Sequence, residues 1–369
     1  MKGSFKSIPV KHAFFLLFLL PTAASAQIPS GYYNGTQGLT GTALQTALHN
    51  KIDNHTDVGY TPGLWNAYYT TDRKPNSGNP GRLWTIYSDK PDSIASPYEF
   101  TLGDQCGSSN ANVEGGCYNR EHIWPRTYFG GQVSPMNSDL WIVYPTDYWV
   151  NSKRQSFPYG KVTAPTFRSR NGSKVGPQTF PGAPSGSAFE PIDSFKGDIA
   201  RSYFYVATRY LSEDASWSDW EMANKAVLKP WAVQMLLQWH QMDPVSQKEK
   251  LRNDAVYLEQ GNRNPFIDSP RFAECIYTPN CSGLSVDERA VAAFSVSPNP
   301  ATNRIQVVLR AGAVKEGMLE LLDVRGRLWL WQEVGEDAEW LDTVGLPRGV
   351  YVLRLRSAKG VVVERVVLQ

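Results

Sequence analysis

An apolar run near the start of the chain predicts an export signal. Residues 13–20 are apolar throughout, three lysines lie before them, and the small residues Ala24, Ser25 and Ala26 follow. This order is typical of a secretory signal peptide, and we expect cleavage after Ala26. The alternative is a membrane anchor, but the run is shorter than the ~20 residues that a helix needs to cross a bilayer.

The middle of the chain alternates helical patterns with long loops. Between residues 198 and 211, apolar side chains recur at helical spacing, and residues 231–240 are also strong helix formers. Irregular segments rich in Trp, Tyr, Asn and Pro connect these patterns. We therefore expect an α+β domain over residues 27–281.

The composition changes near residue 285, where Val, Leu and Arg become dense. Residues 282–293 are predicted to form a linker. Beyond it, short β-forming runs at 305–309, 319–326 and 349–355 are separated by Gly and Pro, and several of them alternate. Residues 294–369 are therefore predicted to form a small antiparallel β-sandwich, a second domain.

The four cysteines fall into two local pairs, Cys106 with Cys117 and Cys275 with Cys281. In an exported protein such pairs predict two disulfides. The alternative is a structural zinc site, but the spacings are not those of paired CxxC motifs.

The net charge of the whole chain, +2, says little about the substrate, but the local distribution of charge says more. The segment 151–188 holds basic residues and no acidic one. Its basic residues are Lys153, Arg154, Lys161, Arg168, Arg170 and Lys174. Such a segment predicts a track for nucleic-acid phosphates, bound without regard to sequence. The alternative is an ordinary solvated loop.

The segment 118–125, Tyr-Asn-Arg-Glu-His-Ile-Trp-Pro, places Glu121 beside His122. Histidine is the side chain whose pKa suits a base near neutral pH. A hard cation on a phosphate prefers oxygen ligands, which Glu121 and the downstream Asn151 supply. Because adjacent strand residues point to opposite faces, we expect Glu121 and His122 on a turn, a bulge or a strand-to-helix junction.

Further segments follow in a fixed order, and together with 118–125 they resemble the bacterial endonuclease I family of secreted nucleases, in the His-Me finger superfamily. The segments are 145–147 (Pro-Thr-Asp), 150–154 (Val-Asn-Ser-Lys-Arg), 157–160 (Phe-Pro-Tyr-Gly), 189–191 (Phe-Glu-Pro), 196–201 (Lys-Gly-Asp-Ile-Ala-Arg), 239–245 and 260–268. The ordered set is more specific than any one motif.

The resemblance implies a ββα-metal site with His122 as the general base and with Glu121 and Asn151 as ligands of Mg²⁺, for which Mn²⁺ or Ca²⁺ can substitute. It implies hydrolysis of DNA, with RNA as a further substrate, to 5′-phosphate products. Arg126 and Arg120 flank the motif and are candidates to stabilise the transferring phosphate or, alternatively, to form salt bridges.

Substrate contacts are expected from Arg120, Lys153 and Arg154, the last lying one helical turn from Asn151. Where the family usually carries Asp-Leu-His, this chain has Trp141 in place of the histidine. The substitution predicts a tuned or weakened enzyme. Nothing resembles a base-reading helix or zinc finger, so no sequence specificity is expected.

The Ser-Pro-Asn-Pro segment at 297–300 and Gly-Val-Tyr-Val-Leu at 349–353 resemble a type IX secretion C-terminal sorting domain. The resemblance implies export through the periplasm of a Gram-negative bacterium, with the secretion machinery as a partner, and a released or surface-bound monomer. Two alternatives remain from the sequence: a sugar-binding secreted protein, favoured by the aromatic content, and an inert nuclease-like surface protein, favoured by Trp141.

Overall fold

The computed structural model describes residues 28–74, 81–90, 96–107, 112–278, 281, 294–309, 317–323, 327–334, 338–357 and 360–369. The predicted signal peptide and the predicted linker lie outside these ranges. The described chain divides into two compact units, one of residues 52–270 with 28–32 and one of residues 33–51 with 271–369. The domain boundaries expected from the sequence stay a prediction.

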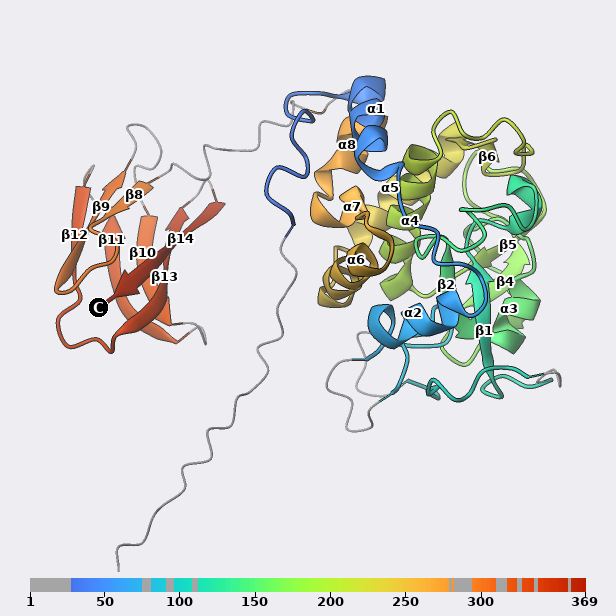
Figure 1. Ribbon diagram of the computed structural model, residues 1–369, viewed down its shortest axis with the longest axis horizontal. Helices are drawn as coiled ribbons and strands as arrows, with labels where there is room; N and C mark the ends of the chain where they lie inside the picture. The colour runs from blue at the N-terminus through green and yellow to red at the C-terminus, as the bar shows by residue number, and fades with distance from the viewer. Residues whose placement is uncertain are drawn as a thin grey trace, which may run out of the picture. The chain divides into compact units, whose positions relative to one another are not determined.

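The first unit mixes helices with short strands (Figure 1). Its helices are α2 (Gly63–Thr71), α3 (Tyr148–Arg154), α4 (Lys196–Arg209), α5 (Pro230–Met242), α6 (Gln247–Gln260) and α7 (Pro265–Asp268), with 3₁₀ turns η1 (Arg126–Phe129) and η2 (Asp193–Phe195). Its strands are β1 (Tyr118–His122), β2 (Val143–Asp147), β3 (Phe167–Arg168), β4 (Lys174–Pro177), β5 (Ser187–Glu190), β6 (Ala223–Asn224) and β7 (Val227–Leu228). The helices predicted at 198–211 and 231–240 are confirmed as α4 and α5.

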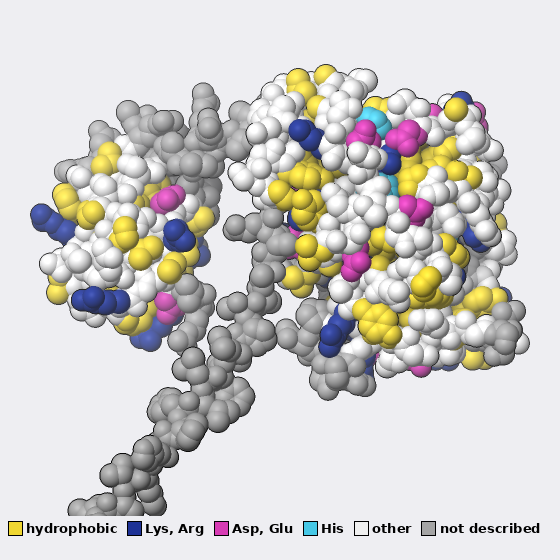
Figure 2. Space-filling view, in the orientation of Figure 1, with side chains coloured by type: hydrophobic (Ala, Val, Ile, Leu, Met, Phe, Trp, Pro, Cys, Tyr) yellow, Lys and Arg dark blue, Asp and Glu magenta, His cyan; other side chains and the backbone are white. Residues whose placement is uncertain are grey.

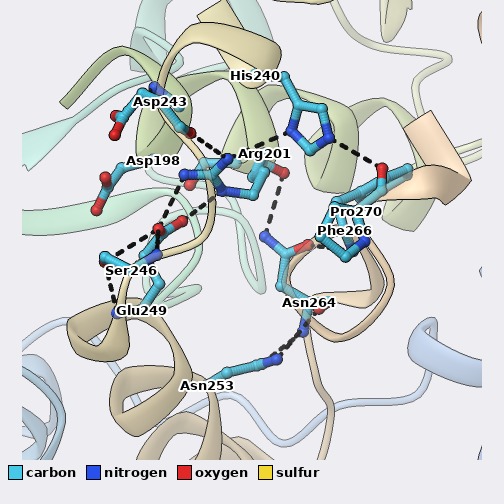
Figure 3. A network of polar contacts seen from close by, with 12 residues as sticks. Asp198, Arg201, His240, Asp243, Ser246, Glu249, Asn253, Asn264, Phe266 and Pro270 are labelled. Atoms are coloured by element: carbon cyan, nitrogen blue, oxygen red, sulfur yellow. Dashed lines mark hydrogen bonds and ion pairs between the residues drawn. The ribbon is translucent and has the colours of Figure 1, made fainter. Parts of the chain in front are cut away.

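Helix α4 forms the centre of this unit, because all of its 14 residues are buried. A helix that is covered on every side must find partners for its polar side chains. Arg201 does so by pairing with Glu249 of α6 and by donating to the carbonyl oxygen of Asp243 at 2.8 Å. The ring of His240 is fixed beside it, since its Nε2 lies 2.9 Å from the carbonyl oxygen of Pro270 (Figure 3).

The same network explains three of the sequence motifs. Segments 196–201, 239–245 and 260–268 supply Arg201, Asp243 and Asn264, whose side chain donates to the backbone oxygen of Arg201 at 3.1 Å (Figure 3). Within the first motif, Gly197 must lack a side chain, because a Cβ there would clash with the carbonyl oxygen of Asp243. These motifs fix the packing of α4, α5 and α6.

The second unit contains α1 (Gly41–Ile52, whose last residue belongs to the first unit), α8 (Arg271–Tyr277) and two antiparallel sheets. One sheet has the order β11-β10-β13-β14 and the other β12-β9-β8. The strands are β8 (Phe294–Ser297), β9 (Arg304–Leu309), β10 (Gly317–Asp323), β11 (Leu328–Val334), β12 (Ala338–Asp342), β13 (Gly349–Ser357) and β14 (Gly360–Leu368).

Alternate residues of these strands point into one shared core. Ile305 and Val307 of β9 belong to the same buried cluster as Leu319 of β10 and Leu353 and Leu355 of β13. Side chains from both sheets therefore meet, as in a β-sandwich. The all-β prediction for the C-terminal part of the chain is confirmed.

Both predicted disulfides are present, Cys106–Cys117 and Cys275–Cys281. The first ends one residue before β1 and so ties the entry of that strand to the preceding loop. Within the residues that the structure describes, no helix is both long and apolar enough to cross a membrane.

Candidate functional site

Strands β1 and β2 pair antiparallel, and α3 begins directly after β2. The register sets Tyr118 opposite Asp147 and His122 opposite Val143. Asp147 then caps α3, because its carboxylate accepts from the backbone N–H of Val150 at 2.9 Å. The cap orients a short helix against the hairpin, with Asn151 and Arg154 one turn apart.

Of the three positions expected for Glu121 and His122, the structure excludes the turn and the bulge and agrees with a strand end shortly before a helical turn, η1. Glu121 and His122 are the last two residues of β1. Successive strand residues face opposite sides, so the two side chains enter different environments. Glu121 shares its face with Asn119, whereas His122 shares its face with Arg120.

On the first face, Glu121 is buried between Tyr87 and Arg154. The Tyr87 hydroxyl donates to Oε1 at 2.8 Å, and Arg154 Nη1 lies 3.1 Å from the same oxygen. Burial raises the pKa of Glu121 to about 7, although Arg154 and the Tyr87 hydrogen bond act to lower it. No hydrogen bond or ion pair to Oε2 occurs within the described part of the chain.

Asn151 lies on the same side of the hairpin. Its Nδ2 donates to Oδ1 of Asn119 at 3.1 Å, and that residue is two positions before Glu121 on β1. The arrangement leaves the amide oxygen of Asn151 without a hydrogen bond among the described residues. One carboxylate oxygen and one amide oxygen are thus available as ligands.

On the second face, His122 is held by the backbone and by aromatic rings. Its Nε2 lies 3.1 Å from the carbonyl oxygen of Asn137, which can only accept, so Nε2 carries the proton and Nδ1 has the lone pair. The ring stacks on Tyr60, with centroids 5.8 Å apart and planes at 24°. Burial lowers the pKa of His122 to about 3, and the charge of Arg126 adds to this effect.

Asn137 belongs to a loop that is itself fixed. Ser134 and Ser138, on either side of Asn137, both donate to the carboxylate of Asp57. The side-chain oxygen of Asn137 is buried and has no hydrogen-bond partner within the described residues. Asp57 thus holds the carbonyl that selects the tautomer of His122.

The arginines predicted at the site have different surroundings. The Arg120 guanidinium lies over the rings of Tyr60, at 3.5 Å, and Trp65, at 4.3 Å. It also donates to the backbone oxygen of Tyr60. Arg126 is half-buried, 5.8 Å from the same Tyr60 ring. The Tyr60 ring therefore lies close to both arginines and to His122.

The prediction that Arg154 binds substrate must be corrected. The residue is 1 % exposed, and besides Glu121 it contacts the carbonyl oxygens of His122 and Ile123 at 3.2 and 2.8 Å. A buried guanidinium with these partners cannot contact a phosphate at the surface. Lys153 remains half-buried at the surface, with its Nζ 3.8 Å from the Trp149 ring centroid.

The predicted basic track is shorter than expected. Lys174 forms an ion pair with Glu190 at 2.9 Å, whereas Lys161, Arg168 and Arg170 are exposed. On the face drawn in Figure 2, the lysines and arginines of the described residues form scattered spots rather than one stripe.

Trp141 is buried and belongs to the core. The guanidinium of Arg252 lies 5.0 Å from its ring, and the Tyr205 ring lies 6.0 Å away. The backbone N–H of Trp141 donates to Asp139 at 2.8 Å. The effect of this residue on activity stays a prediction.

Sequence reasoning missed Tyr60, Tyr87, Asn119 and Asn137. Asn119 is part of the 118–125 motif and could have been found from strand alternation, since it shares a face with Glu121. No sequence pattern distinguishes Tyr87 and Tyr60 from the many other aromatic residues. The backbone of Tyr87 has φ +74°, which is rare outside glycine and is common at functional sites.

The oxygen pair on the first face has the chemistry of a Mg²⁺ site. Mg²⁺ is usually bound through one or two carboxylates and keeps several waters or phosphate oxygens. Among the described residues, no three His, Cys, Asp or Glu side chains gather in one place as metal ligands. Glu121 with Asn151 fits a site that the substrate completes, rather than an all-protein cage.

Two family models and several known proteins match this chain. Residues 40–271 match the family model described as Endonuclease I, and residues 295–369 match the Secretion system C-terminal sorting domain. The extracellular ribonuclease of Bacillus amyloliquefaciens is 35% identical over 271 residues, which cover 70% of this chain and 84% of the relative. The extracellular ribonuclease of Bacillus subtilis (strain 168) is 32% identical over 272 residues, covering 71% and 83%. Endonuclease-1 of Buchnera aphidicola subsp. Baizongia pistaciae is 24% identical over 166 residues, covering 40% and 60%.

Proposed function

The chain belongs to the endonuclease I family and is a nuclease. From that premise we propose that it is a secreted, Mg²⁺-dependent endonuclease. We propose that it cleaves DNA and RNA without a sequence requirement and leaves 5′-phosphates. The names of the two Bacillus relatives support RNA as a substrate. The β1-β2-α3 unit is proposed to be the ββα-metal motif of the His-Me finger superfamily.

His122 is proposed as the general base. The observation that carries this role is the hydrogen bond from Nε2 to the Asn137 carbonyl, because it leaves Nδ1 to accept a proton from water. The lowered pKa keeps the ring neutral at neutral pH. A bound phosphate would offset the nearby arginine charges and so raise the basicity of Nδ1.

Glu121 and Asn151 are proposed to hold Mg²⁺, for which Mn²⁺ or Ca²⁺ can substitute. When bound, the ion supplies positive charge beside the scissile phosphate and the leaving oxygen. Glu121 must be ionised for this role, and the ion pair with Arg154 stabilises the carboxylate while leaving Oε2 open. Arg154 acts by positioning Glu121 and the end of β1.

Arg126 is proposed to stabilise the negative charge that develops on the phosphate. The Arg126 guanidinium lies 5.8 Å from the Tyr60 ring that stacks on His122, and its charge acts to lower the pKa of His122. Within the described residues, no ion pair holds Arg126. Arg120 is less available, because Tyr60 and Trp65 cover its guanidinium. We assign Arg120 to the support of Tyr60 and only secondarily to the substrate.

The C-terminal sorting domain implies the secretion machinery as a partner. The extracellular relatives also support a protein that acts outside the cell. We propose export through the periplasm of a Gram-negative bacterium, which the type IX resemblance implies.

The test is cleavage of supercoiled plasmid DNA and of structured RNA by the purified full chain, with Mg²⁺ and with EDTA. His122→Ala should lower the rate by about 10²–10⁴-fold, the usual contribution of a general base. His49→Ala, on α1, is the matched control and should leave the rate unchanged. Equal Tm values for both variants would exclude misfolding as the cause. Undiminished cleavage by the folded His122→Ala variant, or in EDTA, would refute the mechanism.

A further inference from the structure

A pocket of about 370 Å³ lies where three loop segments meet beside the candidate site. Residues 155–158, which follow α3, form one wall, and residues 184–187, which lead into β5, form another. Tyr128 of η1 and Glu221 complete the lining. The volume is within the range of small-molecule sites, and it exceeds that of a single nucleobase.

The pocket adjoins the groups proposed for catalysis. Gln155 directly follows Arg154, whose guanidinium holds Glu121 and the end of β1. Tyr128 comes two residues after Arg126 in the same 3₁₀ turn. Gln155 also has φ +52°, an unusual conformation that turns the chain at the end of α3. A strand whose phosphate is bound at His122 would have a neighbouring nucleotide within reach of the pocket.

The lining suits a flat, uncharged ring. Tyr128, Phe157 and Pro184 offer apolar surface, and Ser185 and Gln155 offer neutral hydrogen-bonding groups. Glu221 is the one acidic residue of the lining, and no lysine or arginine of the described chain belongs to it. A phosphate would be repelled here, whereas a nucleobase could stack on the aromatic surface and donate to the carboxylate.

The aromatic wall is rigid. Tyr128 stacks on Trp220, with centroids 4.5 Å apart and planes at 19°. Trp220 in turn packs against Trp124, which is two residues from His122. The backbone oxygen of Glu221 accepts from the indole N–H of Trp231 at 3.0 Å, so the carboxylate is carried on a fixed segment. Stacking surfaces held in this way lose little freedom on binding.

We propose that this pocket binds one unstacked nucleobase of the substrate next to the scissile phosphate, and that Glu221 makes it favour guanine. Guanine presents two adjacent N–H donors on its Watson–Crick edge, which a carboxylate accepts as a bidentate pair. Uracil presents one donor between two acceptors and suits Glu221 least. The inference rests on the proposed function, since it assigns a subsite of the same reaction.

The first test is binding, because it does not depend on cleavage. GMP and UMP share ribose and phosphate, so a difference between them reports the base. We expect the wild-type full chain to bind GMP about tenfold more tightly than UMP, the scale of one bidentate base contact, measured by calorimetry in EDTA. Glu221→Gln should reduce this ratio to below about twofold. Glu259 is a half-buried glutamate of α6 outside the pocket, so Glu259→Gln should keep the wild-type ratio of GMP to UMP affinity.

Tyr128→Leu removes the stacking surface and should weaken both nucleotides by about tenfold while it preserves their ratio. Equal binding of GMP and UMP by the wild type, or an unchanged ratio in Glu221→Gln, would overturn the subsite. Neither result would bear on the proposed nuclease activity. That activity is tested separately, by cleavage of plasmid DNA and RNA and by its loss in His122→Ala.

A second readout maps the ends of fragments from an unstructured RNA. Guanine should be enriched at one fixed position beside the cut in the wild type and in Glu259→Gln, and not in Glu221→Gln. Uniform ends in the wild type would contradict the proposal.

Discussion

Arg154 illustrates how burial decides the role of a basic residue. In the sequence it lies in a run without acidic residues, one helical turn from Asn151. In the structure its guanidinium contacts the Glu121 carboxylate and the carbonyl oxygens of His122 and Ile123. Its charge is used inside the protein, where it positions the proposed metal ligand.

Removal of Arg154 should destabilise the fold. Arg154→Met leaves Glu121 buried without its cation, and the loss of one partner of a buried pair costs about 3–5 kcal/mol. We expect this decrease in the free energy of unfolding in urea at pH 8.

Lys153→Met in the same helix is the control. It removes a surface charge, so stability should change by no more than about 0.5 kcal/mol. A small effect for Arg154→Met would mean that the pair with Glu121 contributes little, and the positioning role would then be wrong.

At the scale of elements, strand alternation in β1 separates the proposed metal ligand Glu121 from the proposed base His122. Asn119 and Glu121 face α3, whereas Arg120 and His122 face Tyr60. The sequence places Glu121 beside His122, but the strand directs the acid and the base to opposite sides. The proposed mechanism therefore requires one phosphate to approach the end of β1, where the two faces of the strand meet.

The link from β5 to α4 explains another motif. Glu190 accepts from Lys174, from Lys196 at the start of α4 and from the backbone N–H of Val162. Burial acts to raise the pKa of Glu190, but these hydrogen bonds outweigh it and hold the pKa below 4.5. The carboxylate thus ties the small sheet to the central helix.

This lowered pKa predicts a pH-dependent contribution to stability. The unfolded chain takes up a proton at Glu190 before the folded chain does, so the contribution is present above about pH 4.5 and is lost as the pH falls through the folded pKa. Glu190→Gln should cost about 1.5–3 kcal/mol at pH 7, the scale of hydrogen bonds to a charged group. Thermal unfolding of both proteins from pH 7 to pH 3 checks this. A difference that stays constant over this range would contradict the ionised role.

For the whole molecule, the side chains proposed for catalysis and the strands of the sorting domain belong to different units. The candidate site uses residues between Tyr60 and Arg154, in the first unit, and the sandwich of β8–β14 belongs to the second. The sandwich core is built from its own strands. We therefore expect it to act in export and not in catalysis.

Truncation tests this division of labour. A chain that ends at residue 285 should keep its kcat/KM on DNA within about twofold, because a domain with its own core folds alone. In cells, the truncated chain should fail to reach the medium, while the full chain is exported. A loss of activity in a truncated chain with an unchanged Tm would show that the sandwich takes part in catalysis.

The sequence by itself determined the elements and the chemistry that depend on local order. The spacing around Ile199 and Tyr203 predicted α4, alternating apolar runs predicted the sandwich, and cysteine pairs that are close along the chain predicted both disulfides. The ordered motifs identified the family. Local patterns suffice for these features because helix period, strand alternation and short loop closure involve neighbouring residues.

Tertiary structure decided what depends on contacts between distant residues. Tyr87 reaches Glu121, Asn137 selects the tautomer of His122, and Tyr60 joins His122 to Arg120 only after the chain folds. The burial of Arg154 also follows from packing that no local pattern encodes. Burial and hydrogen-bond partners set the pKa and the availability of a side chain, and both are properties of the folded chain.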